Sequence, residues 1–220
     1  MTKLEQINEG HKNLVFDVAD TIQGWFPRHD MDTLYGLAQK YVKPHGTVLE
    51  VGSWKGRSSL ILAEVCRQKN AKLICMDSFK GLIPTDHVKY DLYHGENGYY
   101  KEGNEGTIMG HILENLRGYD VNFLEGNSTN LHKRVKDGTC DLVFIDGDHD
   151  EPIVSQDIKN FKPKVKTGGV FCGHDYEIQV VDVVIGDEHK EVEKPNSVAV
   201  AVNDNVGEVK LFTTIWYKEI

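Results

Sequence analysis

Short apolar runs alternate with segments of helical periodicity along most of the chain. Five such runs are candidate strands, and each is apolar enough to be covered on both faces, as parallel strands are. They are Thr47–Val51, Lys72–Met76, Val121–Leu124, Asp141–Ile145 and Gly169–Cys172. Helical spacing of apolar positions predicts the segments between them, namely helices at Arg57–Lys69, Thr107–Leu116 and Pro152–Phe161 and a short turn near Leu131–Val135. We therefore expect an α/β fold with a central parallel sheet and helices on both faces.

The two ends of the chain depart from this alternation. Leu4–Gln23 and Asp32–Val42 are predicted helices, and together they indicate an N-terminal helical cap over residues 1–45. Near the other end, Ser197–Asn203 and Val209–Tyr217 are β-rich runs around a polar turn. This pattern predicts an antiparallel β-hairpin at the C-terminus.

Two further segments show no clear period. Gly81–Gly106 is long, glycine-rich and aromatic. A loop of this length in a compact domain is usually either a functional lid or disordered, and its tyrosines favour a lid. The charged stretch Asp187–Lys194 is predicted to be a solvated surface segment.

Composition narrows the class of protein. A chain of 220 residues fits one domain, with residues 46–220 forming the core that follows the cap. The formal net charge of −9 argues against a sequence-independent nucleic-acid-binding protein, which would carry a basic face. No run approaches roughly 18 apolar residues, so no membrane partner is expected. Four widely spaced cysteines without a Cys-x-x-Cys pair predict buried free thiols and a cytoplasmic protein.

The stretch Thr47–Ser59 combines a strand end, a glycine-rich turn and a helix start. Glu50 and Gly52 end the apolar run, Gly56 follows four residues after Gly52, and Ser58 opens the next apolar-periodic segment. Such a turn lets the backbone approach a ligand closely, and the helix start offers unpaired N–H groups. The glycine spacing differs from the G-x-G-x-x-G pattern of dinucleotide-binding enzymes. We therefore expect a ligand-binding turn of another class.

Asp77 stands at the carboxyl end of the second predicted strand, about 20 residues after the glycine turn. A carboxylate at that place can accept hydrogen bonds from both ribose hydroxyls of a nucleoside. The alternative is a carboxylate that caps a helix or turn. Ser78 and Phe79 follow directly, where they could flank an adenine ring. Asn127 and Ser128 follow the third predicted strand, where they could contact adenine or serve as an ordinary helix cap.

Ionisable side chains crowd together after the fourth and fifth predicted strands. Asp146, Asp148 and His149 follow one strand, and His174 and Asp175 follow the next. Because the carboxyl ends of neighbouring parallel strands meet at one edge of a sheet, we expect the two clusters to lie together. Carboxylate oxygens suit Mg²⁺, whereas an imidazole ligand would favour Mn²⁺, Zn²⁺ or Fe²⁺. The alternative is a set of solvated loop carboxylates with a histidine bonded to the backbone.

The glycine turn, with an acidic residue two positions before Gly52, resembles motif I of class I S-adenosylmethionine-dependent methyltransferases. The pairing of I-D-G-D-H at 145–149 with G-H-D-Y at 173–176 resembles the family-24-type methyltransferases, which are related to metal-dependent O-methyltransferases of sugars and catechols. The resemblance spans Thr47 to Ile220 and implies a Rossmann-like class I fold. It also implies S-adenosylmethionine as cofactor. The residues implied to bind it are Glu50, Gly52, Ser53, Trp54, Gly56, Ser58, Asp77, Ser78, Phe79, Asn127, Ser128 and Asp146.

The same resemblance implies a divalent metal, Mg²⁺ or Mn²⁺, at Asp146, His174 and Asp175. His174 departs from the family pattern, which has an oxygen ligand there, so the sequence leaves the metal requirement open. His149 lies three residues beyond Asp146, where catechol-type enzymes place a catalytic lysine. We therefore take His149 as the candidate general base and Asp146 as the second candidate catalytic residue.

Together these features predict a methyltransferase that acts on a hydroxyl of a small-molecule or sugar acceptor, with help from a divalent metal. Two other classes stay open. A metal-dependent hydrolase could use the Asp and His clusters, but it leaves Glu50, Gly52 and Asp77 without a role. A non-catalytic nucleoside-binding partner subunit is the other alternative, and Asp146 and His149 argue against it. The sequence is compatible with a homo-oligomer.

Overall fold

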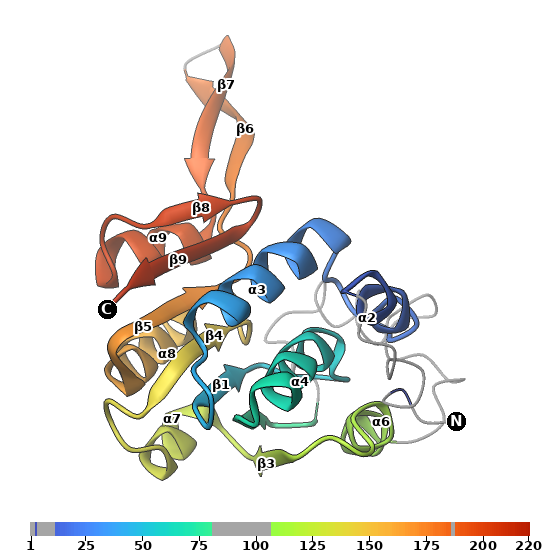
Figure 1. Ribbon diagram of the computed structural model, residues 1–220. Coiled ribbons are helices and arrows are strands. Elements are labelled where there is room, and N and C mark those ends of the chain that lie inside the picture. Colours follow the sequence, from blue (N-terminus) through green and yellow to red (C-terminus); the bar gives the residue numbers. More distant parts are fainter. Residues whose placement is uncertain (1–2, 4–11, 81–106, 186–187) are drawn as a thin grey trace.

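The computed structural model describes residue 3 and residues 12–80, 107–185 and 188–220. The expected lid at residues 81–106 and the first part of the expected helix Leu4–Gln23 lie outside the described residues. Within the described ranges the chain forms one seven-stranded sheet, a two-stranded ribbon and helices on both faces of the sheet (Figure 1). The predicted α/β architecture is therefore confirmed.

The sheet has the strand order β3-β2-β1-β4-β5-β9-β8, and its first five strands are parallel. The parallel strands are β1 (Thr47–Val51), β2 (Lys72–Asp77), β3 (Val121–Glu125), β4 (Cys140–Ile145) and β5 (Val165–Gly173). Val51, at the end of β1, pairs with Met76 on one side and with Ile145 on the other, and Ile145 pairs with Gly173. The strands therefore end at one level, and the residues that follow them share one edge of the sheet.

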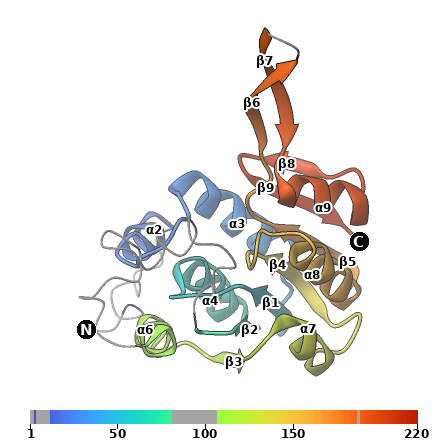
Figure 2. The ribbon, with the colours of Figure 1, turned by 180° about the vertical axis from the view of Figure 1, so that it is seen from behind.

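Two hydrophobic cores lie on opposite faces of the sheet. Figures 1 and 2 show from two sides the helices that cover these faces. Alternate residues of β4 divide between them, since Leu142 and Phe144 face one core while Val143 and Ile145 face the other. This explains why the buried strands are continuous apolar runs. One face is covered by α2 (Lys12–Ala19), α3 (Arg28–Tyr41), α4 (Arg57–Lys69) and α6 (Ile108–Asn115). The other is covered by α7 (Ser128–Leu131), α8 (Ile153–Phe161) and α9 (Ser197–Asn205), with short 3-10 turns at His132–Arg134 and Lys162–Lys164.

The C-terminal region corrects one prediction. The run Ser197–Asn203 was expected to be a strand but belongs to helix α9. Asn196 caps this helix, because its side-chain oxygen accepts a hydrogen bond from the backbone N–H of Ala199 at 2.8 Å. Buried positions 198, 201 and 202 follow helical spacing and pack against the second core. The antiparallel hairpin itself is present but shorter, formed by β8 (Lys210–Phe212) and β9 (Ile215–Glu219), and β9 pairs with β5.

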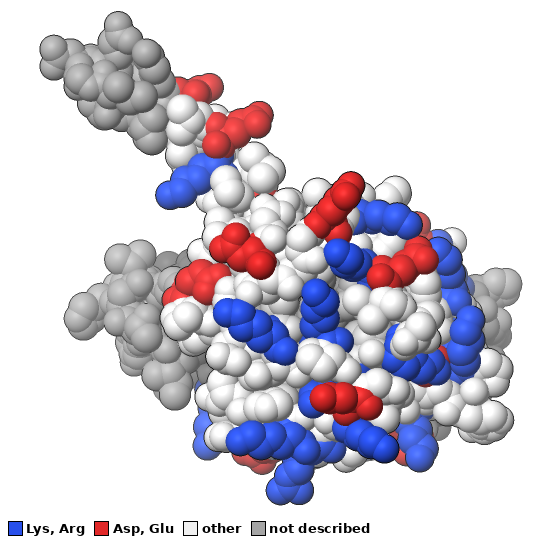
Figure 3. Space-filling view, turned by 90° about the vertical axis from the view of Figure 1, so that its left-hand side faces the viewer, with Lys and Arg blue, Asp and Glu red and all other residues white. Residues whose placement is uncertain are grey.

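A second difference is the two-stranded ribbon β6 (Ile178–Ile185) and β7 (Glu188–Pro195), which projects from the body of the protein (Figure 1). The expected surface segment Asp187–Lys194 supplies most of β7, and the predicted solvent exposure is confirmed at residues 191–194. Figure 3 shows the face on the left of Figure 1, where basic and acidic side chains are interspersed.

All four cysteines are buried and unpaired, as predicted, and burial raises the pKa of each thiol. None of the helices in the described ranges has the length and apolar character that a bilayer crossing requires.

Candidate active site

The glycine turn after β1 packs directly against the backbone that follows β4. Gly52 has a φ of 92°, and a Cβ atom added to it would lie 2.0 Å from the carbonyl oxygen of Asp146. Its N–H donates to the carbonyl of Met76 at 2.8 Å. Gly56 also has a positive φ, of 91°, and precedes the first residue of α4. Only glycine combines this conformation with so close an approach, which brings three strand ends together.

The buried side chain of Glu50 stabilises this turn through hydrogen bonds. Its side chain is fully buried and accepts hydrogen bonds from the hydroxyls of Ser58, at 2.6 Å, and Ser59. Burial raises the pKa of this carboxyl group, and the serine hydroxyls oppose the rise. Glu50 therefore ties β1 to the first turn of α4, which fixes the direction of the helix start.

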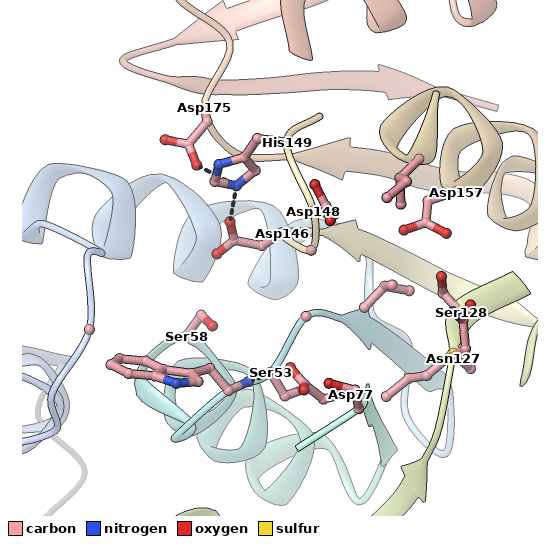
Figure 4. Close-up of a pocket in the computed structure, with 18 of the residues that line it drawn as sticks. Ser53, Ser58, Asp77, Asn127, Ser128, Asp146, Asp148, His149, Asp157 and Asp175 are labelled. Carbon is pink, nitrogen blue, oxygen red and sulfur yellow. Dashed lines mark hydrogen bonds and ion pairs between the residues drawn. The ribbon is translucent and has the colours of Figure 1, made fainter. Parts of the chain in front are cut away.

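A cavity of about 460 Å³ lies above the ends of β1, β2 and β4 (Figure 4). Most residues predicted from the sequence to bind a nucleoside cofactor line it. They are Gly52, Ser53, Trp54, Ser58, Asp77, Ser78, Asn127, Ser128 and Asp146. Glu50, Gly56 and Phe79 do not line the cavity: Glu50 and Gly56 shape the turn, and Phe79 is buried against Phe123.

The carboxylate of Asp77 has a fixed orientation in this cavity. One oxygen accepts the backbone N–H of Trp54 at 2.8 Å, and the other accepts that of Phe79 at 2.7 Å. Burial raises its pKa, and these hydrogen bonds oppose the rise. Each carboxylate oxygen can accept more than one hydrogen bond, so both can still receive a hydroxyl hydrogen. The geometry fits the predicted contact with a ribose.

At the other end of the cavity, His149 lies between two carboxylates (Figure 4). Its Nε2 is 3.0 Å from Oδ2 of Asp175 and 3.9 Å from Oδ1 of Asp146. Burial lowers the pKa of the ring, but the two carboxylates outweigh it and raise the pKa to about 10. The side chain is 54% exposed, so it can be reached from solvent. The predicted meeting of the clusters after β4 and β5 is thus present.

His174 lies beneath this group and is only 6% exposed. Its Nδ1 is 3.1 Å from Asp175 and 3.4 Å from Asp146, and its Nε2 is 3.0 Å from Oδ2 of Asp30. Burial opposes the charge on the ring, but the three carboxylates raise its pKa to about 12. Asp30 is itself buried at the start of α3 and accepts a hydrogen bond from Thr214 at 3.0 Å. Asp30 thus anchors the N-terminal cap to the site.

Asp146, His149 and Asp175 each offer one ligand atom, and these three atoms lie within 4.8 Å of one another. Two carboxylates and an imidazole form a donor set that suits Mn²⁺, Zn²⁺ or Fe²⁺, whereas the two carboxylates without the imidazole suit Mg²⁺. The group contains the predicted ligands Asp146 and Asp175 with His149 beside them, while His174 lies outside it. Both ring nitrogens of His174 face carboxylates, so it orients Asp146 and Asp175.

Asp157, which was not predicted as a site residue, lines the cavity near Ser128. It lies on α8 between the buried positions Val154, Ile158 and Phe161, and it is 3% exposed. An acidic residue on the apolar face of an amphipathic helix is the signal that could have revealed it. Asp30 carries the same signal on α3.

Asp157 should make the stability of the cofactor-free protein depend on pH. Burial, with a contribution from the charge of Asp148, raises its pKa from 3.8 to about 6, while Ser128 and His132 oppose the rise. The folded carboxyl group therefore keeps its proton between about pH 4 and 6, where the unfolded one loses it, and stability falls as pH rises through this window by about 3 kcal/mol at most. Asp157→Asn should remove this fall. Urea unfolding of both proteins at pH 4.5 and 7.5 measures it, and equal pH dependence in the two would contradict it.

A second cavity of about 500 Å³ adjoins the first. The two share Gly24, Trp25, Phe26, Arg57 and Asp175, and the second is also lined by Pro27, His29, Asp30, His174, Glu177 and Thr214. Trp25 stacks on Trp54, with ring centroids 5.0 Å apart. Arg57 donates to the carbonyl of Gly24 at 2.7 Å. Residues of the N-terminal cap therefore form the wall between the two cavities.

Comparison with known proteins shows which family this chain belongs to. A family model described as "Methyltransferase domain" matches residues 49–176, which is more than half of the chain. The chain belongs to this methyltransferase family. The matched segment runs from β1 through the cluster after β5, so it contains both the glycine turn and the acidic edge of the sheet. The protein is thus a class I enzyme that uses S-adenosylmethionine, as the sequence resemblance implies.

Solved structures that are similar to this chain include a methyltransferase with the same fold. The calicheamicin methyltransferase CalS11 is 14% identical with a TM-score of 0.58, and the match covers 98% of this chain and 89% of that one. A protein from Corynebacterium glutamicum is 14% identical with a TM-score of 0.50, covering 77% and 70%. The S-adenosylhomocysteine-bound methyltransferase PaMTH1 of Podospora anserina is 15% identical with a TM-score of 0.49, covering 77% and 65%. The CalS11 match extends the likeness to the N-terminal helices and the C-terminal hairpin of this methyltransferase.

Proposed function

We propose that this methyltransferase transfers the methyl group of S-adenosylmethionine to a hydroxyl of a small-molecule or sugar acceptor, with a divalent metal at the carboxyl edge of the sheet. One observation carries the proposal. The cavity that suits the cofactor adjoins a second cavity, and Asp175 lies in the wall that they share. A donor in one cavity and an acceptor in the other would meet beside Asp175 and His149.

Residues at different positions along the first cavity would contact different parts of the cofactor. Asp77 would accept the ribose hydroxyls, and the turn at Ser53 and Trp54 would hold the methionine part close to the start of α4. Asn127 and Ser128 would contact the adenine. The cofactor supplies an activated methyl group on sulfur, so the protein mainly has to align it with the acceptor oxygen.

Asp146 and Asp175 are the proposed oxygen ligands of the metal, and His174 and Asp30 hold them in place. A divalent metal here would lower the pKa of a bound hydroxyl group. With a cation held by Asp146 and Asp175, the two carboxylates would no longer favour the protonated form of His149. Its ring, which is half exposed at the cavity mouth, can then accept the proton of the acceptor hydroxyl.

The second cavity supports an uncharged, hydroxylated acceptor. Asp175 and Glu177 line it with carboxylates that accept hydrogen bonds from hydroxyl groups. The guanidinium of Arg57 is already paired with Asp20 at 2.5 Å, so it does not favour a phosphorylated acceptor. Trp25 adds an exposed aromatic surface of the kind that sugar rings contact. CalS11, which shares the fold, is described as a calicheamicin methyltransferase.

The hydrolase and the non-catalytic partner subunit are not favoured, because membership of the methyltransferase family accounts for the glycine turn and Asp77 together. We keep the cytoplasm as the proposed location on the basis of the four buried, unpaired thiols.

Isothermal titration of the purified protein with S-adenosylhomocysteine tests the cofactor site, with and without Mg²⁺ or Mn²⁺. We expect micromolar binding and an effect of the metal on the affinity. Transfer of a labelled methyl group to a panel of sugars and phenols would then test the acceptor class. Absence of S-adenosylhomocysteine binding under all conditions would refute the proposed cofactor site.

A further inference from the structure

A buried carboxylate without a full set of partners lies at the end of the first cavity beside Ser128 (Figure 4). The hydroxyl of Ser128 is near enough to the side chain of Asp157 to lower its pKa, yet the Oδ1 atom of Asp157 is buried and has no hydrogen-bond partner. Leaving a buried acceptor unpaired costs free energy, more so for a charged group. The side chain lines the cavity, so a ligand there can supply the missing donor.

The surroundings of Asp157 suit a flat aromatic base. Ile153, which is 41% exposed, precedes it by one turn of α8, and Met76 lines the cavity from the end of β2. The loop after β3 closes the same end with residues 126–129. Asp77 lies between this end and the glycine turn, so a nucleoside whose ribose contacts Asp77 would place its base here. This step rests on the cofactor position given under Proposed function.

We propose that Asp157 selects adenine in the cofactor, with its Oδ1 accepting a hydrogen bond from the 6-amino group and Ser128 holding the carboxylate in position. A carboxylate can only accept hydrogen bonds, and the 6-amino group can only donate them at this site. A purine with a 6-oxo group would present an acceptor to an acceptor and leave both unpaired. The site therefore discriminates against 6-oxo purine analogues of the cofactor.

The test compares binding of S-adenosylhomocysteine and S-inosylhomocysteine, which differ in the amino and oxo groups at position 6. Isothermal titration at pH 7.5 should show that the wild-type protein prefers the amino compound by about 30-fold or more. Asp157→Asn should reduce the preference to about threefold or less, because a carboxamide can rotate to offer either a donor or an acceptor. Glu151→Gln is the matched control, since Glu151 precedes the same helix, is exposed and lies outside the cavity. It should keep the wild-type preference.

Different results of this titration would refute the cofactor site and the role of Asp157. If the wild-type protein binds neither compound, the cofactor site itself is wrong. If it binds both with affinities within threefold, the selection by Asp157 is refuted without any variant. A folded Asp157→Asn protein, judged by its thermal unfolding, that keeps the wild-type preference would also overturn the inference.

Discussion

Gly52→Ala is expected to lower the affinity for S-adenosylhomocysteine by about 100-fold or more. A Cβ at this position would lie 2.0 Å from the carbonyl oxygen and 2.4 Å from the carbonyl carbon of Asp146. These are backbone atoms, so the strain cannot be relieved by a side-chain rotation. The positive φ of Gly52 adds a further cost for alanine. The turn and the segment after β4 must therefore separate, which displaces the walls of the cavity on both sides.

Gly36→Ala is the matched control for this substitution. Gly36 lies within α3, is exposed, and has no atom within 4 Å of an added Cβ. Alanine there should stabilise the helix by up to about 1 kcal/mol and leave the affinity unchanged. Isothermal titration and thermal unfolding of both variants measure the two effects. Wild-type affinity in a folded Gly52→Ala protein would contradict the assigned role of the turn. If that variant does not fold, Asp77→Ala tests the same cavity through a side chain that lines it.

Asp175→Ala is expected to weaken Mn²⁺ binding by about 100-fold or more. Losing a group that only orients a metal ligand commonly costs 10- to 100-fold in affinity, so the loss of a direct ligand should cost at least as much. The variant also leaves His149 and His174 without a carboxylate that both contact. Titration of the protein with Mn²⁺, followed by the electron paramagnetic resonance signal of the free ion, measures the affinity directly. The measurement is made with and without S-adenosylhomocysteine.

Glu177→Ala provides the comparison for Asp175→Ala. Glu177 follows the same strand two residues later and is exposed, and it does not belong to the three-residue group. Its removal should change the Mn²⁺ affinity by less than about threefold, because screened charges outside the ligand set contribute little. A wild-type protein without saturable Mn²⁺ binding would remove the metal from the proposed mechanism. Equal affinities of Asp175→Ala and wild type would place the ion elsewhere.

The parallel core of the fold was predictable because its strands are short apolar runs whose ends are marked by glycine and acidic residues. Because β4 is buried on both faces, it has no polar residue between Leu142 and Ile145. A continuous apolar run of this kind predicts both a strand and a parallel sheet. The glycine turn and the clusters around Asp146 and Asp175 were predictable for the same reason. They directly follow strands whose carboxyl ends must share an edge.

Helix α9 was mispredicted because its sequence satisfies two patterns. Alternating valine and alanine at 198–202 suggests a strand, yet Val200 is 36% exposed while Ala199 and Ala201 are fully buried. The small alanines allow the helix to lie against α8, and Asn196 determines where it starts. Packing and capping together outweighed the β propensity of valine.

The contact between Asp30 and His174 was not predicted, because local sequence gives only a weak sign that Asp30 faces inward. Asp30 and His174 are 144 positions apart in the chain, and their contact depends on how α3 crosses the end of β5. Local sequence instead suggests that Asp30 is an exposed acidic residue in the first turn of a helix. Only its spacing to the buried Leu34 and Leu37 hints that it faces inward.

The projecting ribbon has a consequence for how the protein behaves at high concentration. β6 and β7 pair only with each other among the described strands, so each has an outer edge whose backbone groups could pair with another chain. Ile178 and Val180 are exposed on β6, which would favour such edge-to-edge association. Exposed Glu191, Glu193 and Lys194 on β7 act against it, because an incoming strand would have to desolvate these charges. The charges that make this stretch resemble a solvated loop are thus the ones that protect an unpaired strand from aggregation.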